Sequence, residues 1–110
     1  MKSPNTANIA RLNDQLRRDF LGGSILITPG VQALSHTVRA KLLKAVRGFD
    51  CFTEDNDPHG ERDFGRIDMA DQQFFFKVDY YNPAMDGCSS DNSDPEVTRR
   101  VLTIMEASEY

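Results

Sequence analysis

The sequence has little of several features that define whole classes of protein. It contains no tryptophan and only two cysteines, Cys51 and Cys88, in 110 residues. Two cysteines allow one disulfide at most, and because no export signal precedes them we expect free thiols. The longest apolar runs, SILIT and FFF, are too short to cross a bilayer. Residues 1–20 lack the apolar core of a signal peptide, so we expect a cytoplasmic protein without membrane contact.

Positive charge is scarce in the second part of the chain. Residues 1–49 carry eight Lys/Arg and two Asp/Glu, whereas residues 50–110 carry five Lys/Arg and fifteen Asp/Glu. The net charge is −4 and the pI is about 5.0. Since nucleic-acid binding draws most of its affinity from phosphate contacts with Lys and Arg, direct nucleic-acid binding is not expected. The hydrophobic content of 39% is ordinary for a globular chain, and its length suits one domain with one core.

Apolar residues recur at helical spacing in two segments of the first half. The pattern predicts a helix over about 6–20, ended by Gly22-Gly23, and a second helix over about 35–47 that begins at Ser35. Between them, SILIT at 24–28 is short, apolar and β-branched, as is typical of a buried strand.

The second half contains a predicted β-hairpin. Two strand-like runs, 62–69 and 72–82, are separated by Ala70-Asp71. Side chains alternate along a strand, so one face of the second run should be the core face, with Phe74, Phe76, Val78 and Tyr80. The other face is mixed, which predicts that it is half-covered or functional; it carries Phe75, Lys77, Asp79 and Tyr81.

The C-terminal segment is predicted to be helical. Asp94-Pro95 is typical of a helix start, and an apolar stripe follows over about 95–107. We therefore predict the order α-β-α-β-β-α in an α+β fold, with three helices on a small three-stranded, mostly antiparallel sheet. A single domain over 1–110 is expected, with 1–5 and 83–94 flexible.

The only clustered chemistry lies in FTEDNDPHGERDFG, residues 52–65. Its spacing matches the first half of a calcium loop, but Arg66 stands where the bidentate glutamate belongs. A site for another divalent metal is the alternative, and its candidate ligands are Asp55, Asp57, His59, Glu61 and Asp63. Alternatively the stretch is turn chemistry, in which the aspartates around Pro58 bond their own backbone.

Catalysis has weaker support than binding. No serine or cysteine nucleophile is paired with a base, and no glycine-rich phosphate loop is present. We assign no catalytic residue and no cofactor, and we expect a binding protein rather than an enzyme.

Four stretches carry a family resemblance: GGSILITPGVQAL, FDCFTEDNDPHGERDFG, FFFKVDYYNP and DPEVTRRVLTIMEASEY. Together they resemble a bacterial family of small proteins, domain of unknown function 3768, from about Ile9 to Tyr110. The resemblance implies association with plasmids or other mobile DNA. It supplies neither a reaction nor site residues.

Three hypotheses follow from these features. The first is a non-enzymatic protein that binds another protein, in the manner of an accessory or counter-defence inhibitor. Its expected contact residues are Asp55, Asp57, His59, Glu61, Tyr80 and Tyr81. The second is a metal-binding protein or metal-dependent enzyme that uses the loop over 55–63. The third is a homodimer that pairs through the mixed face of the second hairpin strand.

Overall fold

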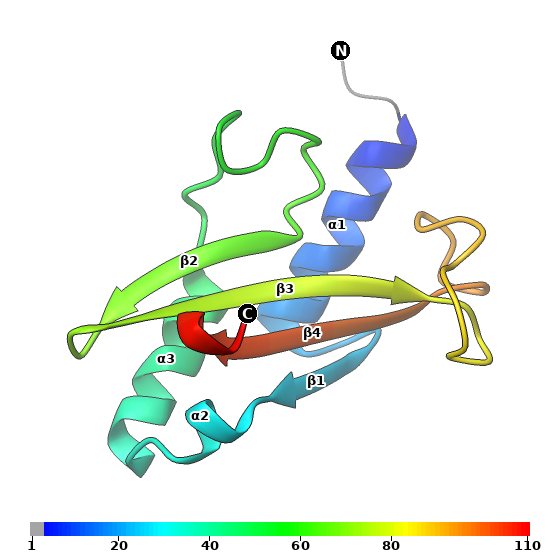
Figure 1. Ribbon diagram of the computed structural model, residues 1–110. Helices are drawn as coiled ribbons and strands as arrows, with labels where there is room; N and C mark the ends of the chain where they lie inside the picture. The colour runs from blue at the N-terminus through cyan, green and yellow to red at the C-terminus, as the bar shows by residue number, and fades with distance from the viewer. Residues whose placement is uncertain (1–3) are drawn as a thin grey trace.

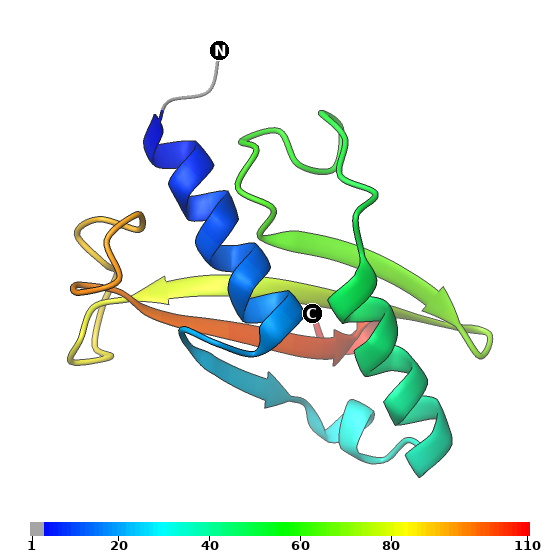
Figure 2. The same cartoon turned by 180° about the vertical axis from the view of Figure 1, so that it is seen from behind.

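A mixed sheet with helices on one face forms the body of the protein (Figures 1 and 2). The computed structural model describes residues 4–110. Its elements in chain order are α1 (Pro4–Asp19), β1 (Ser24–Ile27), α2 (Pro29–Gln32), α3 (His36–Gly48), β2 (Phe64–Met69), β3 (Gln72–Tyr81), β4 (Arg99–Glu106) and the 3-10 turn η1 (Ala107–Glu109). The predicted α+β class is therefore confirmed, although the sheet has four strands instead of three.

The strand order across the sheet is β1-β4-β3-β2. The hairpin β2–β3 and the pair β3–β4 are antiparallel, and β1 joins the edge parallel to β4. The predicted hairpin is confirmed, including its two-residue connection. Ala70 and Asp71 have φ angles of 52° and 61°. Two successive positive φ angles are the geometry of a type I′ turn, whose twist matches that of the strands it joins.

The predicted C-terminal helix over 95–107 is wrong, because this segment contains the central strand β4. The turn at its start does form: the Asp94 carboxylate accepts a hydrogen bond from Glu96 N at 2.9 Å, and Val97 N bonds to Asp94 O. The chain then extends between β1 and β3. Since β4 packs on both faces, its burial is nearly continuous, and the alternation that marks a half-buried strand is missing.

Both long helices lie close to their predicted ranges. Ser35 caps α3, its hydroxyl oxygen accepting a hydrogen bond from Val38 N at 3.2 Å. Within the predicted flexible stretch 1–5, residues 1–3 lie outside the described residues. The loop over 83–94 has no helix or strand, as expected, and its flexibility stays a prediction.

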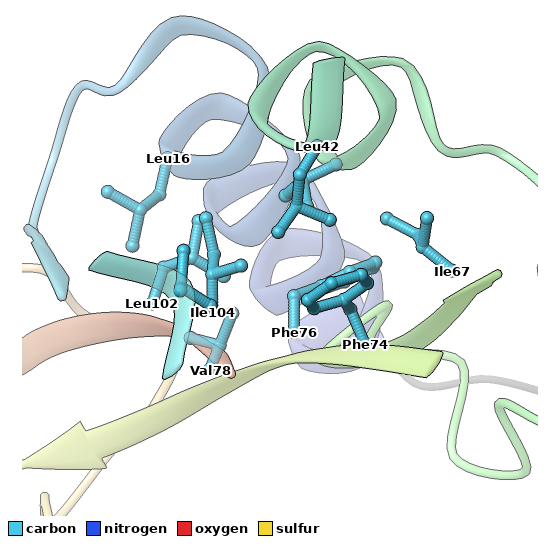
Figure 3. Close-up of a cluster of buried hydrophobic side chains, with 10 residues drawn as sticks. Leu16, Leu42, Ile67, Phe74, Phe76, Val78, Leu102 and Ile104 are labelled. Atoms are coloured by element: carbon cyan, nitrogen blue, oxygen red, sulfur yellow. The ribbon is translucent and has the colours of Figure 1, made fainter. Parts of the chain in front are cut away.

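The core lies between the sheet and the two long helices (Figure 3). The predicted core face of β3 is confirmed, since Phe74, Phe76 and Val78 are all buried there. They meet Leu16 from α1 and Leu42 from α3, and Leu102 and Ile104 extend the cluster across β4.

Candidate interaction surfaces

The acidic loop between α3 and β2 is an ordered structure built on its own backbone. Asn56 is its local anchor: its side-chain oxygen accepts from Thr53 N at 2.8 Å, and its amide nitrogen donates to Cys51 O at 2.8 Å. The Thr53 hydroxyl accepts in turn from Asn56 N at 3.3 Å. These reciprocal bonds are the Asx and hydroxyl turns expected of such a sequence, and they leave Asp55 exposed between them.

Asp57 points inward and holds the second half of the loop. Its carboxylate oxygens lie 3.1 and 3.3 Å from Arg62 N, and its carbonyl oxygen accepts from Gly60 N at 3.0 Å. Arg62 has a φ of 57°, a left-handed conformation that is unfavourable for a side chain of this kind. The carboxylate stabilises that bend, so Asp57 is committed to the loop itself.

An arginine–aspartate–arginine chain ties the loop to the helices. The Asp14 carboxylate accepts from Arg17 at one oxygen and from Arg62 at the other, both at 2.9 Å. Arg17 is fully buried and also donates to the carbonyl oxygens of Val46, Arg47 and Phe49 at the end of α3. Burial lowers the pKa of Arg17. The guanidinium thus caps the end of α3 from inside the protein, adding a donor to carbonyl oxygens of its last turn.

A second polar network lies under the loop and is centred on Asn13 of α1. The Asn13 amide donates to Glu61 O at 3.0 Å and to the Tyr80 hydroxyl at 2.8 Å. The Tyr80 hydroxyl donates to a Glu61 carboxylate oxygen at 2.9 Å, and Arg100 Nε donates to the Asn13 side-chain oxygen at 2.7 Å. Burial raises the pKa of Tyr80, which keeps its hydroxyl protonated as this network requires.

The candidate contact residues of the loop therefore do not form one surface. Asp57 is buried, and Glu61 and Tyr80 are half-buried and bonded to each other. Asp55 and His59 are exposed, and Tyr81 projects from the other face of the sheet. Asp63 is half-buried, and its pKa is raised mainly by that burial. Within residues 4–110 no group of three or more His, Cys, Asp or Glu side chains could hold a metal ion, so the candidate ligands are not brought together.

The face of the sheet opposite the helices carries an open hollow of about 520 Å³. This face of the sheet is turned toward the viewer in Figure 1, where the C-terminal turn η1 lies in front of it. We call this surface the open-face hollow; it is lined by Leu26, Thr28, Lys77, Asp79, Tyr81, Met85, Val101, Thr103, Met105 and Glu109. Leu26 and Met85 are 55% and 52% exposed, so they add apolar surface to the hollow. The predicted mixed face of β3 is thus confirmed as half-covered.

The C-terminal segment covers the other half of that face. The Tyr110 ring packs edge-on against Phe64 and Phe75, with ring centroids 5.8 and 5.5 Å apart. Glu109 fixes the segment, its carboxylate accepting from the Thr28 hydroxyl at 2.6 Å and from Gly30 N at 2.9 Å. It thereby caps α2 in place of Thr28, whose side chain makes no cap bond. These hydrogen bonds lower the pKa of Glu109.

Sequence reasoning missed the residues that organise both regions. Asn13, Arg17 and Arg100 are buried on the sides of their elements that face the protein interior. Sequence patterns assign polar residues to the exposed side, so these three were not recognised. One signal was available: Asn13 and Arg17 are four residues apart in α1 and flank Leu16, so all three share one helix face. Glu109 gave no such signal, because its partners lie 79 and 81 residues away.

Fold and surfaces together define a small acidic α+β protein whose sheet is covered by helices on one face. No helix within residues 4–110 is long and apolar enough to cross a membrane, and both cysteines are free and exposed. The chain belongs to the family described as protein of unknown function (DUF3768), whose model matches residues 27–109. The match begins at the end of β1 and so leaves α1 outside. Neither the curated proteins nor the solved structures gave a match.

Proposed function

We propose that this protein is a small, acidic, non-enzymatic binding protein of the cytoplasm that acts by contact with another protein. The observation that supports the proposal most is the open-face hollow. Its exposed apolar side chain on the sheet is Leu26, next to the nearly buried Val101 and Met105 of the neighbouring strand, and its rim is polar. An apolar floor within a polar rim is the usual anatomy of a protein interface.

The rim favours a protein partner over a small apolar ligand. Lys77 and Asp79 form a surface ion pair at 3.0 Å, and Tyr81 and Glu109 stand beside it. The hydrogen bond from Lys77 to Asp79 raises the pKa of Lys77, so the rim presents a fixed charge of each sign. Tyr81 and Met85 are of residue types enriched at interfaces, and the tyrosine adds contact area at low entropic cost.

The particular role that we propose is that of an inhibitor or accessory protein carried on mobile DNA. This part rests on the resemblance to proteins met on plasmids. A chain of net charge −4 with exposed carboxylates at Glu54 and Asp55 is suited to a basic partner surface. The loop over 49–63 is held rigid by Asn56 and Asp57, so little conformational entropy would be lost on binding.

The experiment compares two exposed leucines. Leu21 and Leu26 are 56% and 55% exposed, but only Leu26 lines the open-face hollow. Tagged wild-type protein, Leu21→Asp and Leu26→Asp would be used to isolate partners from a lysate of the host. We expect Leu26→Asp to lose the partner, with affinity reduced about tenfold or more, and Leu21→Asp to keep it. A photo-crosslinking residue at position 81 should then capture the same partner.

Light scattering separates a foreign partner from a second copy. If the protein is a dimer that Leu26→Asp converts to a monomer, the partner is another copy of this chain. If the wild-type protein is monomeric and the two leucine variants retain the same proteins in equal amounts, the open-face hollow is not an interface and the proposal is wrong.

A further inference from the structure

A second hollow, of about 700 Å³, lies on the helical side of the molecule. It is formed where the end of α1 meets α3, which lie side by side as the blue and green helices of Figure 2. We call it the basic groove; its lining residues are Arg18, Phe20, Ala40, Leu43, Lys44, Arg47 and Gly48. The volume is within the usual range for ligand-binding clefts.

Arg47 is held in a fixed position in this groove. Its Nε donates to Arg18 O at 2.9 Å, and its guanidinium lies over the Phe20 ring, 4.8 Å from the centroid. Phe20 has a φ of 57°, a left-handed conformation that is costly for an aromatic residue and that directs the ring toward α3. The two terminal nitrogens of Arg47 donate to no residue in the described part of the chain. A fixed guanidinium with both terminal nitrogens available is suited to bidentate contact with a carboxylate.

The groove concentrates positive charge on an otherwise acidic protein. Arg18, Lys44 and Arg47 are exposed, and none of the three forms an ion pair within residues 4–110. The lining residues include no Asp or Glu. Three cations without a counter-charge repel one another, and a bound anion would relieve that repulsion.

The floor of the groove distinguishes between anionic ligands. Leu43, Ala40 and the edge of Phe20 provide apolar surface beside the cations. A nucleic acid would need open aromatic faces for its bases, but the Phe20 face is already covered by Arg47. A short peptide that carries both carboxylates and an apolar side chain matches the floor and the rim together.

We propose that the basic groove binds an acidic peptide segment of a partner protein. An apolar side chain of that segment packs on Leu43 and Ala40, and flanking carboxylates pair with Arg47 and Lys44. This surface is separate from the open-face hollow, because it lies on the helices and not on the uncovered face of the sheet. The two surfaces can therefore be tested independently.

The test uses a fluorescein-labelled peptide, Glu-Glu-Leu-Glu-Glu, and fluorescence anisotropy. Two comparison peptides replace the glutamates with glutamine or the leucine with alanine, and a single-stranded DNA of equal charge is the third probe. We expect saturable binding of the first peptide, and weaker binding of both replacements. Amide chemical-shift changes in an NMR titration should concentrate at Leu43, Lys44 and Arg47.

Two lysines on α3 supply the matched variants. Lys41 and Lys44 are both exposed, but only Lys44 lines the groove. We expect Lys44→Glu to weaken peptide binding about tenfold, and Lys41→Glu to change it by less than about threefold, because its charge acts only through solvent. Arg47→Lys keeps the charge but loses the planar fork, and should also weaken binding.

Three results would overturn the proposal. The first is no binding of the peptide at millimolar concentration. The second is an equal loss with Lys41→Glu and Lys44→Glu, which would indicate non-specific attraction. The third is tighter binding of the DNA than of the peptide, which would assign the groove to nucleic acid instead.

Discussion

The two faces of the sheet differ in where they place polar and apolar side chains. The helix-covered face buries Arg17, Asn13 and Arg100, and each of them finds partners inside the protein. The other face leaves Leu26 and Met85 in solvent, although both are apolar. Polar groups are thus inside and apolar groups outside at these positions. The inner polar side chains are held by hydrogen bonds, although Arg17 Nε is buried without a partner. Leu26 and Met85 stay more than half exposed and so are accessible to a partner.

The largest expected effect tests the covered face at Arg17. Replacing it by alanine removes four donated hydrogen bonds to Asp14 and to the end of α3. Since the carbonyl oxygens at the end of α3 and the Asp14 carboxylate each lose a donor inside the protein, we expect the free energy of unfolding to fall by about 3–5 kcal/mol. Urea denaturation followed by circular dichroism measures this loss. Arg11→Ala, an exposed arginine of the same helix, is the control and should change stability by less than about 0.5 kcal/mol.

A smaller loss of stability is expected from adding a side-chain carbon to Gly65, which lies in β2 against the core aromatic rings. A Cβ atom on Gly65 would lie 2.3 Å from the Phe76 ring and 3.0 Å from that of Phe49. Gly65→Ala should therefore force the core aromatics apart and cost about 1–3 kcal/mol. At Gly48, in contrast, no atom lies within 4 Å of the added carbon, so Gly48→Ala should be neutral or slightly stabilising. Similar denaturation midpoints for the two variants would contradict this account of the covered face.

Tyr80 and Tyr81 give the most direct comparison, because neighbours in a strand point to opposite faces. Tyr80→Phe removes a hydroxyl that accepts from Asn13 and donates to Glu61, and we expect a loss of about 1–2 kcal/mol. Tyr81→Phe removes a hydroxyl at the open-face hollow and should change stability by less than about 0.5 kcal/mol. Thermal unfolding of both variants checks the difference. An equal effect on stability would mean that the Asn13 network contributes little.

Much of the fold could be predicted from the sequence, and the part that failed had a physical cause. α1, α3 and the hairpin follow from local patterns of apolar residues and turns. β4 does not, because it is buried on both faces and contains Arg100, so its spacing fits a helix as well as a strand. Only the pairing with β1 and β3 decides between them, and that contact is remote in sequence.

The candidate site was harder to predict for a related reason. The prediction that the aspartates around Pro58 hold the turn is confirmed for Asp57, whose bonds are local. Asp55 makes none of the loop's hydrogen bonds and is exposed, and Glu61, an expected contact residue and candidate metal ligand, has its carboxylate bonded to Tyr80. Arg47 and Leu26 belong to surfaces that arise only when distant elements meet, and no local pattern indicates them.

The smallest expected effect is a pH dependence of the C-terminal segment. Glu109 holds this segment over one half of the outer face of the sheet, next to the open-face hollow. Hydrogen bonds from the Thr28 hydroxyl, Gly30 N and Glu106 N lower the pKa of Glu109. Its folded pKa therefore lies below the unfolded value of about 4.3. The ionised Glu109 carboxylate therefore contributes its full stabilisation of the fold above the unfolded pKa, and this stabilisation is lost as the pH falls through the folded pKa.

Acidification should therefore release the C-terminal segment and widen the open-face hollow before it unfolds the protein. NMR shifts of the Gly30 and Glu106 amides should titrate together in the wild-type protein, and Glu109→Gln should abolish that titration. Asp91, whose pKa is lowered by Ser93 far from this segment, supplies the control: Asp91→Asn should leave the Gly30 titration unchanged. If the Gly30 amide titrates equally in Glu109→Gln, another carboxylate holds the segment, and the boundary of the hollow does not depend on Glu109.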